Sequence, residues 1–325
     1  MEKVRFGIIG LGKIASRFAR VLGQSESGEL FAAAARDADR AAHFAGEYGA
    51  KRSYGSYSEL IQDPEVELVY IAVPHNFHYD LIKECLLNGK GVLCEKPMVL
   101  TRDKAKVLCS LAKKKNLFLM EAMWTRCLPA VRRAAEWAQS GKIGDIKLID
   151  AAFCFRSEFD PASRLFNPAL AGGALYDVGV YPLMFAMDIA GEIPAETAGF
   201  ASMCPTGVDD CNALLLRFSG GALALIRSAS SVLMPPDAVI YGTKGHIRLP
   251  NFYRAESAEL YESGGRLLEC YEAPFVDGFL YEIEHAAQLF REGKIESERV
   301  PWQDTIACAG IFDEMREKWG IAGER

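Results

Sequence analysis

A glycine-rich turn near residue 10 constrains this fold more than any other feature of the sequence. The apolar, strand-like run Val4–Ile9 leads into Gly10-Leu-Gly12-Lys-Ile-Ala15, and a helical pattern follows. Between a strand and a helix, Gly10 permits a tight turn, Gly12 lets the backbone approach a pyrophosphate, and Ala15 allows close packing of helix on strand. The helix N-terminus would face the phosphates with its partial positive charge. The alternative is a plain strand–turn–helix without a ligand.

Apolar runs alternate with helical stretches through residue 120. Strands are expected at Leu30–Ala35, Leu68–Val73, Val92–Cys94 and Leu117–Met120, and a helix at Thr101–Lys115. This alternation predicts a doubly wound parallel sheet. In such a sheet, ligands bind beyond the carboxyl ends of the strands. Polar or aromatic residues follow these strands, so we expect a site at that edge.

The second half has a different pattern, which predicts an open, mostly antiparallel sheet. Helices Tyr176–Ala190 and Phe279–Glu292 are expected to cover one face of it, and the helix Asp304–Lys318 to serve packing only. The uncovered face predicts a homodimer formed through this sheet. The length favours two domains, residues 1–122 and 123–325. The expected strands are Ile146–Phe155, Glu196–Cys204, Asn212–Phe218, Leu223–Ser231, Ala238–Gly242, His246–Leu249 and Glu259–Tyr261.

Charge and composition narrow the classes of function. The net charge is −6 and no basic face is visible, so nucleic acid is not an expected partner. We see no transmembrane stretch and no signal peptide, and therefore expect no membrane. The nine cysteines are scattered without a Cys-x-x-Cys motif, which favours reduced thiols and a cytoplasmic protein.

The strand Val92–Cys94 ends abruptly in Glu95, Lys96 and Pro97. Proline fixes φ and lacks a backbone donor, so the strand must stop there. A carboxylate and an ammonium at the mouth of a buried strand are costly unless they are used. We therefore consider this turn a candidate site; the alternative is a solvated loop with a chance ion pair.

The end of the second strand carries Arg36-Asp37, and Arg40 follows one helical turn later. Two guanidinium groups suit the 2′-phosphate of NADP, whereas an NAD site usually places a carboxylate near this point. Asp37 would oppose the phosphate unless it turns away to cap the next helix. This pattern favours NADP(H), with NAD as the alternative cofactor; two surface arginines are the simpler interpretation.

A second constellation lies between a strand and a helix of the second half. The paired glycines Gly172-Gly173 make a turn at which backbone can approach a ligand. Asp177 and Tyr181 follow, four residues apart and so on one helix face. Taken alone, Asp177 is better explained as a helix-dipole partner, and Tyr181 as a core aromatic with a satisfied hydroxyl.

Together, the first glycine turn, Glu95-Lys96-Pro97 and Gly172-Gly173-x-x-x-Asp177-x-Gly179 resemble the glucose–fructose oxidoreductase / inositol dehydrogenase (Gfo/Idh/MocA) family over nearly the whole chain. The resemblance implies a Rossmann domain followed by an open, mostly antiparallel α/β domain, with sugars or polyols oxidised between them. Tyr181 stands where many members have His, which is similar to the dimeric dihydrodiol dehydrogenase branch with its NADP-dependent D-xylose dehydrogenases. Trp124-Thr-Arg126 is similar to that branch too. The same change could instead mark altered or lost chemistry.

The resemblance also implies roles for individual residues. Tyr181 would be the acid/base, Lys96 would assist it from a cis Lys96–Pro97 turn, and Asp177 would accept from a substrate hydroxyl or orient Lys96. Trp124 would line the pocket that binds the sugar. His78 would lie near the cofactor or simply be packed. The residues expected to contact the cofactor are Gly10, Gly12, Lys13, Ile14, Arg36, Asp37, Arg40, Ala72, Pro74, Asn76, His78, Glu95, Lys96, Trp124, Arg164 and Tyr281.

The expected chemistry is hydride transfer, in which the cofactor carries the hydride and the protein handles the proton. Free tyrosine has a pKa of about 10, and lowering it by two units needs about 2.7 kcal/mol. A unit charge at about 4 Å supplies up to about 4 kcal/mol at an effective dielectric of about 20. Lys96 alone could therefore activate Tyr181, and no metal is expected. His75, His78 and Cys94 are the nearest approach to a zinc ligand set.

Three hypotheses follow from these observations. The leading one is an NADP-dependent dehydrogenase of a sugar or small cyclic diol. The second is a cofactor-binding sensor or scaffold without chemistry, and the third is a reductase of a keto-sugar or an unsaturated ring. The loops Arg156–Pro168 and Leu233–Asp237 would set which substrate is accepted.

Overall fold

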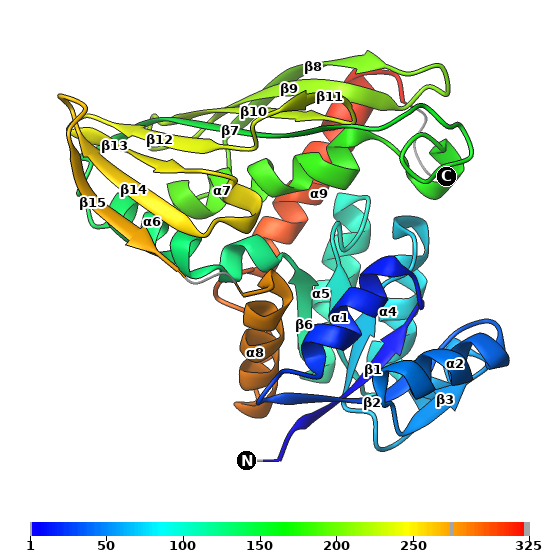
Figure 1. Ribbon diagram of the computed structural model, residues 1–325. Helices are drawn as coiled ribbons and strands as arrows, with labels where there is room; N and C mark the ends of the chain where they lie inside the picture. The colour runs from blue at the N-terminus through cyan, green and yellow to red at the C-terminus, as the bar shows by residue number, and fades with distance from the viewer. Residues whose placement is uncertain (1, 274–275, 322–325) are drawn as a thin grey trace. The chain divides into compact units, whose positions relative to one another are not determined.

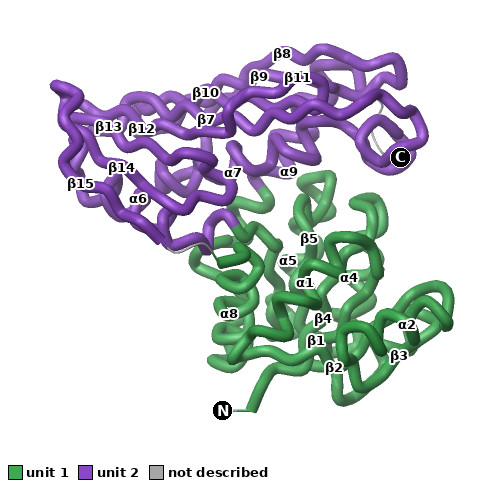
Figure 2. Tube along the Cα trace, viewed as in Figure 1, with its two compact units in different colours: residues 1–124, 276–306 green, residues 125–275, 307–325 purple. Residues whose placement is uncertain are grey.

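A computed structural model describes residues 2–273 and 276–321 of the chain (Figure 1). The chain divides into two compact units (Figure 2). Unit 1 comprises Met1–Trp124 and Val276–Ile306, and unit 2 comprises Thr125–Phe275 and Ala307–Arg325. Residues 276–306 pack in unit 1, although they follow the strands of unit 2 in sequence.

Unit 1 is built on a six-stranded sheet of order β3-β2-β1-β4-β5-β6 in which neighbouring strands are parallel. This is the doubly wound Rossmann order, so the predicted fold class of the first half is confirmed. Its apolar strands are buried, as expected when helices cover both faces. The short strand β3 was not predicted. The strands are β1 (Val4–Ile9), β2 (Gly28–Ala34), β3 (Arg52–Tyr54), β4 (Leu68–Ile71), β5 (Gly91–Glu95) and β6 (Leu119–Ala122).

Side-chain caps fix where several helices of unit 1 begin. Asp37, Ser56 and Thr101 each accept a backbone N–H three residues on, which satisfies a donor that the first helical turn leaves unpaired. The helices are α1 (Lys13–Leu22), α2 (Ala38–Tyr48), α3 (Tyr57–Gln62), α4 (His78–Leu87), α5 (Arg102–Lys115) and α8 (Gly278–Arg291).

Helix α8 corrects one prediction. The stretch Phe279–Glu292 was expected on the second sheet, but α8 packs against α1 and β2 of unit 1. The Phe279 ring meets Phe18 edge-on at a centroid distance of 5.6 Å, and Asp277 pairs with Arg17 at 2.7 Å. An amphipathic pattern specifies an apolar face but not its partner, so the sequence could not assign this helix.

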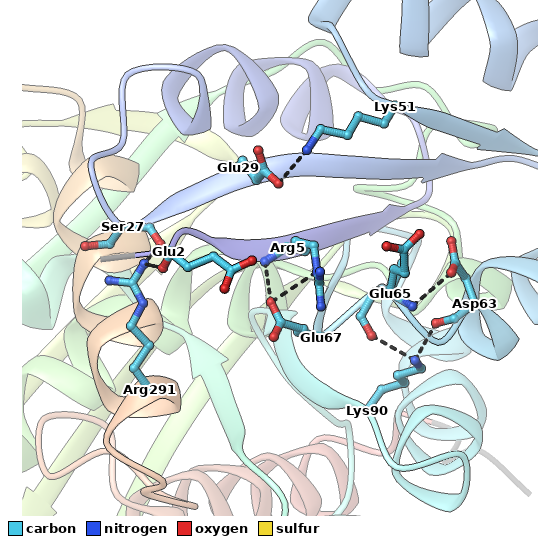
Figure 3. Close-up of polar contacts among 11 residues, drawn as sticks. Glu2, Arg5, Ser27, Glu29, Lys51, Asp63, Glu65, Glu67, Lys90 and Arg291 are labelled. Carbon is cyan, nitrogen blue, oxygen red and sulfur yellow. Dashed lines mark hydrogen bonds and ion pairs between the residues drawn. The ribbon is translucent and has the colours of Figure 1, made fainter.

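Polar contacts tie together the amino ends of the unit 1 strands (Figure 3). Lys90 is buried and donates to the carbonyl oxygens of Asp63 and Val66 at 2.5 and 2.8 Å. Arg291 of α8 donates to the carbonyl oxygen of Ser27 at 2.8 Å. These groups serve the sheet edge opposite the one where ligands are expected.

Unit 2 is built on a nine-stranded sheet of order β15-β14-β13-β12-β7-β10-β9-β8, with β11 paired to β7. Its pairs are antiparallel except β7 with β10, which confirms the predicted mostly antiparallel sheet. Strands β11 and β15 were not predicted. The strands are β7 (Ile146–Arg156), β8 (Glu196–Met203), β9 (Asp209–Arg217), β10 (Leu223–Ala229), β11 (Ser231–Met234), β12 (Ala238–Gly242), β13 (Gly245–Leu249), β14 (Ser257–Glu262) and β15 (Leu267–Glu272).

Helices cover one face of the second sheet. Helix α6 (Pro129–Gln139) packs against β13, β14 and β15, and α7 (Val180–Ala190) packs against β7 and β10. The boundary between the units falls within α9 (Trp302–Lys318), after Ile306. The helical stretch Pro168–Ala190 is long and apolar enough to cross a membrane by length and composition alone. However, 94% of its most apolar window is buried inside the protein, as in a core helix.

The strand register places exposed apolar side chains on one face of this sheet. Phe200 lies opposite Ala213, and Leu215 lies opposite Leu225, so Phe200 and Leu215 project from the same side. Their exposed fractions are 86% and 48%. Tyr241, opposite Leu148, is 43% exposed on that side too. The ion pair of Arg227 and Asp150 lies on the same side, so this face mixes charged side chains with exposed apolar ones, and the exposed apolar side chains make it a candidate interaction surface.

Candidate active site

Unit 1 contains a cavity of about 500 Å³ at the carboxyl ends of β1, β2 and β4. This is the edge at which the parallel sheet was expected to bind its ligand. Its wall includes seven residues predicted from the sequence, and it also includes Tyr57 at the start of α3, which sequence reasoning missed. The lining residues are Gly10, Leu11, Gly12, Ala35, Arg36, Asp37, Arg40, Tyr57, Ala72, Val73 and Pro74.

The two glycines of the first turn differ in what surrounds them. Gly10 has φ +88°, and a Cβ there would lie 2.7 Å from the carbonyl oxygen of Ala72, so only glycine fits. A Cβ at Gly12 would meet nothing within 4 Å. Gly10 therefore serves the tight turn, and the open space over Gly12 suits a group that approaches the backbone, as a pyrophosphate does. Lys13 and Ile14 begin α1 and lie outside the lining of the cavity.

Asp37 lines the cavity, and its side chain caps the next helix, as the sequence suggested. Its Oδ1 accepts the backbone N–H of Arg40 at 2.7 Å, which caps α2. The guanidinium of Arg40 donates to the carbonyl oxygen of Leu11 at 2.6 Å, beside the glycine turn. Arg36 lies in the cavity wall. The donor set thus fits an anionic cofactor at this end of the sheet.

The turn after β5 is held from two sides. The Lys96–Pro97 bond is cis, as predicted. The His78 ring is fully buried, with Nε2 2.9 Å from the carbonyl oxygen of Val73 and Nδ1 3.0 Å from that of Pro97. The ring is therefore packed within unit 1, and this burial lowers the pKa of His78. Asn76 lies in the short helical turn His75–Phe77 that precedes it.

Two carboxyl groups, the buried Glu121 and the half-buried Glu95, also hold this turn. Glu121, at the end of β6, accepts the backbone N–H of Met98 at 2.8 Å and the hydroxyl of Thr305 at 2.6 Å. Tyr70 of β4 donates its hydroxyl to Glu95. Burial, followed by the charge of Glu95, raises the pKa of Tyr70 well above its usual value. Hydrogen bonds at the ends of strands β4, β5 and β6 therefore fix the backbone that carries Lys96.

Trp124 belongs to an aromatic and cationic cluster of unit 1. Its ring lies 5.0 Å from that of Phe279, and the guanidinium of Arg17 lies 4.8 Å from the Trp124 ring. Tyr281 is half-buried on α8, two residues after Phe279. Arg17 and Phe279 were not predicted as neighbours of Trp124, because α1 and α8 are far apart in sequence and share no motif.

In unit 2 the structure brings together Arg164, Asp177 and the helix of Tyr181. A guanidinium nitrogen of Arg164 lies 2.8 Å from Oδ1 of Asp177, whose side chain is 9% exposed. The predicted helix begins with a π-helical turn, Leu175–Gly179, and continues as α7. Such turns occur frequently at functional sites. Arg164 was expected to contact the nicotinamide, and its observed partner in unit 2 is Asp177.

Tyr181 lies in an aromatic cluster that the sequence did not reveal. Its ring meets Phe153 of β7 at 5.2 Å and Tyr253 at 6.1 Å, both edge-on, while Phe153 and Tyr253 stack at 4.0 Å. Alternation along β7 could have placed Phe153 on the helix-covered face, but nothing in the sequence near Tyr253 pointed to Tyr181. The cluster gives Tyr181 one well-defined ring position.

Within residues 2–273 and 276–321, no group of three or more His, Cys, Asp and Glu side chains could hold a metal ion. His75 and His78, two of the three residues weighed as zinc ligands, have ring centroids 5.7 Å apart. His78 uses both ring nitrogens on backbone carbonyl groups.

Comparison with known proteins agrees with these two units. Residues 4–123 match the oxidoreductase family with an NAD-binding Rossmann fold, and residues 131–248 match the GFO/IDH/MocA C-terminal domain. The chain is 36% identical to trans-1,2-dihydrobenzene-1,2-diol dehydrogenase of Mus musculus, over 98% of this chain and 97% of the relative. It is 33% identical to the enzyme of that name from Homo sapiens, with the same coverage.

Among solved structures, a 3-ketoreductase from Actinomadura kijaniata in complex with NADP and TDP-benzene is 25% identical. The similarity covers 97% of this chain and 98% of that one, with a TM-score of 0.86. Both domain matches and the full-length relatives point the same way. The chain belongs to the Gfo/Idh/MocA family and is an NAD(P)-dependent oxidoreductase.

Proposed function

We propose that this protein transfers a hydride between a hydroxyl-bearing carbon of a sugar or small cyclic diol and NADP, with Tyr181 as the acid/base. The observation that carries the proposal is the setting of Tyr181, which follows the Asp177 turn and packs on Phe153 and Tyr253. Relatives at 33 to 36% identity over nearly the full chain are named as diol dehydrogenases. A tyrosine hydroxyl is a proton donor and acceptor suited to this chemistry.

We assign the following roles in this reaction to individual residues. In the oxidative direction Tyr181 acts as tyrosinate, which Lys96 would stabilise, and becomes neutral tyrosine when it takes the proton of the substrate hydroxyl. Asp177, held by Arg164, accepts a hydrogen bond from a substrate hydroxyl or orients Lys96. Trp124 offers an apolar wall to the C–H groups of the substrate. The nicotinamide, when bound, supplies the hydride acceptor.

The cofactor proposal rests on the cavity of unit 1. The glycine turn would hold the pyrophosphate, and Arg36 with Arg40 would pair with a 2′-phosphate, so that NADP is preferred and NAD is the alternative. The turn around Glu95, with Asn76, Lys13 and Ile14 near the glycine loop, would complete the contacts predicted from the sequence. Arg164 and Tyr281 are proposed on the nicotinamide side. Residues 1–122 would bind most of the dinucleotide, and residues 123–325 would bind the substrate, form the dimer and supply Arg164 and Tyr281 to the nicotinamide.

Two other functions stay open to test. A reductase of a keto-sugar would use the same residues in the opposite direction, and the structural relative from Actinomadura kijaniata is named a 3-ketoreductase. A sensor or scaffold would bind NADP(H) without turnover. The presence of both Lys96 and Tyr181 in the sequence argues against a sensor, which needs neither group.

We also propose a cytoplasmic homodimer formed through the exposed face of the second sheet. Phe200, Leu215 and Tyr241 project from that face, and burying them against a second copy would remove apolar surface from water.

To test this proposal, the reduction of NADP+ is measured by absorbance with a panel of aldoses, polyols and trans-dihydrodiols. The same panel is measured with NAD+. We expect turnover on a diol or aldose with NADP+ preferred. Turnover with NAD+ preferred would keep the Tyr181 mechanism and overturn the phosphate role of Arg36. If a protein that binds NADPH is silent in this direction but oxidises NADPH with a keto-sugar, it is a reductase. Silence in both directions would indicate the sensor.

A further inference from the structure

A buried polar cluster formed by Asp209, Asn212 and Ser228 lies behind the π-helical turn Leu175–Gly179. Asp209 and Asn212 belong to β9, Ser228 belongs to the neighbouring β10, and their exposed fractions are 1, 5 and 1%. Ser228 lies directly opposite Asn212 in the strand register. The Ser228 hydroxyl donates to Oδ1 of Asn212 at 2.8 Å, and Nδ2 of Asn212 donates to Oδ2 of Asp209 at 2.8 Å.

The cluster contacts the beginning of the turn directly. Oδ2 of Asp209 also accepts the backbone N–H of Leu175, the first residue of the turn, at 2.8 Å. The first N–H groups of a helix have no partner within it, so this carboxyl group acts as a cap supplied from the sheet. Burying three polar side chains is costly unless their hydrogen bonds are made, and each bond requires a close and specific distance.

Two glycines allow the turn to come this close. Gly173 has φ +125°, and a Cβ there would lie 2.4 Å from Oδ1 of Asp209. A Cβ at Gly179, the last residue of the turn, would lie 2.8 Å from the Ser228 hydroxyl oxygen. A side chain at either position would push the turn off the cluster. Both glycines belong to the sequence motif that contains Asp177. The close contact between the turn and the cluster therefore depends on this motif.

We propose that the Asp209–Asn212–Ser228 cluster positions Asp177 and Tyr181 for catalysis by seating the π-helical turn on the sheet. The three residues are positioning residues, and the inference rests on the acid/base role proposed for Tyr181. Asp177 lies within the turn and donates its backbone N–H to the carbonyl oxygen of Gly173 at 3.1 Å. Tyr181 follows the turn by two residues. A displacement of about 1 Å at reacting groups can cost about 100-fold in rate.

The test is a double-mutant cycle between Gly179→Ala and Ser228→Ala. The new methyl group collides with the Ser228 hydroxyl oxygen. Without that oxygen, the nearest atoms are the side-chain Cδ1 of Leu175 at 3.1 Å and the Ser228 Cβ at 3.5 Å. A small shift at the end of the Leu175 side chain then lets the turn return to its place on the sheet. Gly179→Ala should therefore be damaging by itself and tolerated beside Ser228→Ala, which itself loses only the hydrogen bond to Asn212.

The readouts are kcat with NADP+ and trans-1,2-dihydrobenzene-1,2-diol, the Kd of NADPH, and hydrogen exchange of the peptide 173–183. We expect Gly179→Ala to lower kcat by about 100-fold and Ser228→Ala by about tenfold. The double variant should recover to within about threefold of Ser228→Ala. The Kd of NADPH should stay unchanged throughout, and exchange should quicken in Gly179→Ala and slow again in the double variant.

Matched controls separate positioning from general damage. Ser230→Ala removes another buried hydroxyl just beyond the same strand, and Gly46→Ala adds a methyl group where nothing lies within 4 Å. Both should leave kcat and exchange unchanged. A kcat of the double variant equal to the product of the single losses would overturn the inference, as would unchanged exchange in Gly179→Ala. A wild-type protein without turnover in either direction would overturn the proposed function, while exchange would still report on the seating of the turn.

Discussion

At Asp37 a carboxylate stands between two arginines that would have to bind a phosphate. Its hydrogen bond to the Arg40 backbone N–H resolves the conflict, because the charge serves the start of α2. This possibility could be stated from the sequence, since aspartate is a common N-cap. Tyr57 could not be found in that way. It lines the same cavity from α3, and no motif links it to the glycine turn.

Replacing Arg36 tests the cofactor preference at the scale of one residue. Arg36→Leu should raise the KM for NADP+ by about 10- to 100-fold, because a charge-assisted hydrogen bond to a phosphate is lost. The KM for NAD+ should stay within a few-fold of the wild-type value. Steady-state kinetics with both cofactors measures this. Arg20→Leu, at an exposed arginine of α1 outside the cavity, is the control. Equal losses for both cofactors would refute the phosphate role.

Replacing Tyr181 tests the acid/base. Tyr181→Phe keeps the ring that contacts Phe153 and removes only the hydroxyl. We expect kcat to fall by about 100- to 10,000-fold, the usual contribution of a general acid or base. The Kd of NADPH should change little. Tyr271→Phe, on β15, is the matched control. Retained turnover in Tyr181→Phe would exclude the proposed role.

Among the elements, the sequence predicted those with strong periodicity and missed the short ones. β1, β5 and α5 were predicted within a few residues, because their apolar spacing and bounding glycine, proline or threonine are local signals. β3 and β15 are short or exposed edge strands without that spacing. The π-helical turn depends on Asp209 and Ser228, which lie far away in sequence. Local pattern therefore could not foresee it.

Helix α8 carries an element-scale prediction about pH. Glu282 is fully buried, and in the described part of the chain neither carboxyl oxygen has a hydrogen-bond partner. Burial and then the charge of Glu95 raise its pKa well above the usual value. The folded state therefore keeps a proton that the unfolded state releases, so stability should fall as pH rises from about 4.3, the unfolded value.

We expect Glu282→Gln to abolish this loss, because the amide never ionises. Between pH 5 and 7 the wild-type protein should lose up to about 2.7 kcal/mol more stability than the variant. Urea unfolding at both pH values measures the difference. Glu292→Gln, at the exposed end of the same helix, is the control. Its free energy of unfolding should depend on pH as that of the wild-type protein does. Parallel slopes for wild type and Glu282→Gln would show that Glu282 does not hold the proton.

At the scale of the whole molecule, the alternation of strands and helices was enough to predict two sheets of different kind. The parallel order follows from strand–helix alternation, and the second sheet from short alternating strands. What the pattern could not assign was where a single helix packs. α8 lies in unit 1 after a long excursion of the chain through unit 2, and an amphipathic helix fits either sheet by pattern alone.

The exposed face of the second sheet carries the last prediction. Phe200 and Leu215 project from neighbouring strands on that face, and a stable dimer would bury them. Phe200→Glu with Leu215→Glu should convert a dimer into a monomer, because two carboxylates would have to be buried at the interface. Light scattering coupled to size exclusion measures the mass. Leu87→Glu, at a leucine 53% exposed on α4, is the control and should stay dimeric. A wild-type protein that is a monomer would exclude the homodimer. A double variant that remains a dimer would show that the dimer forms through another surface.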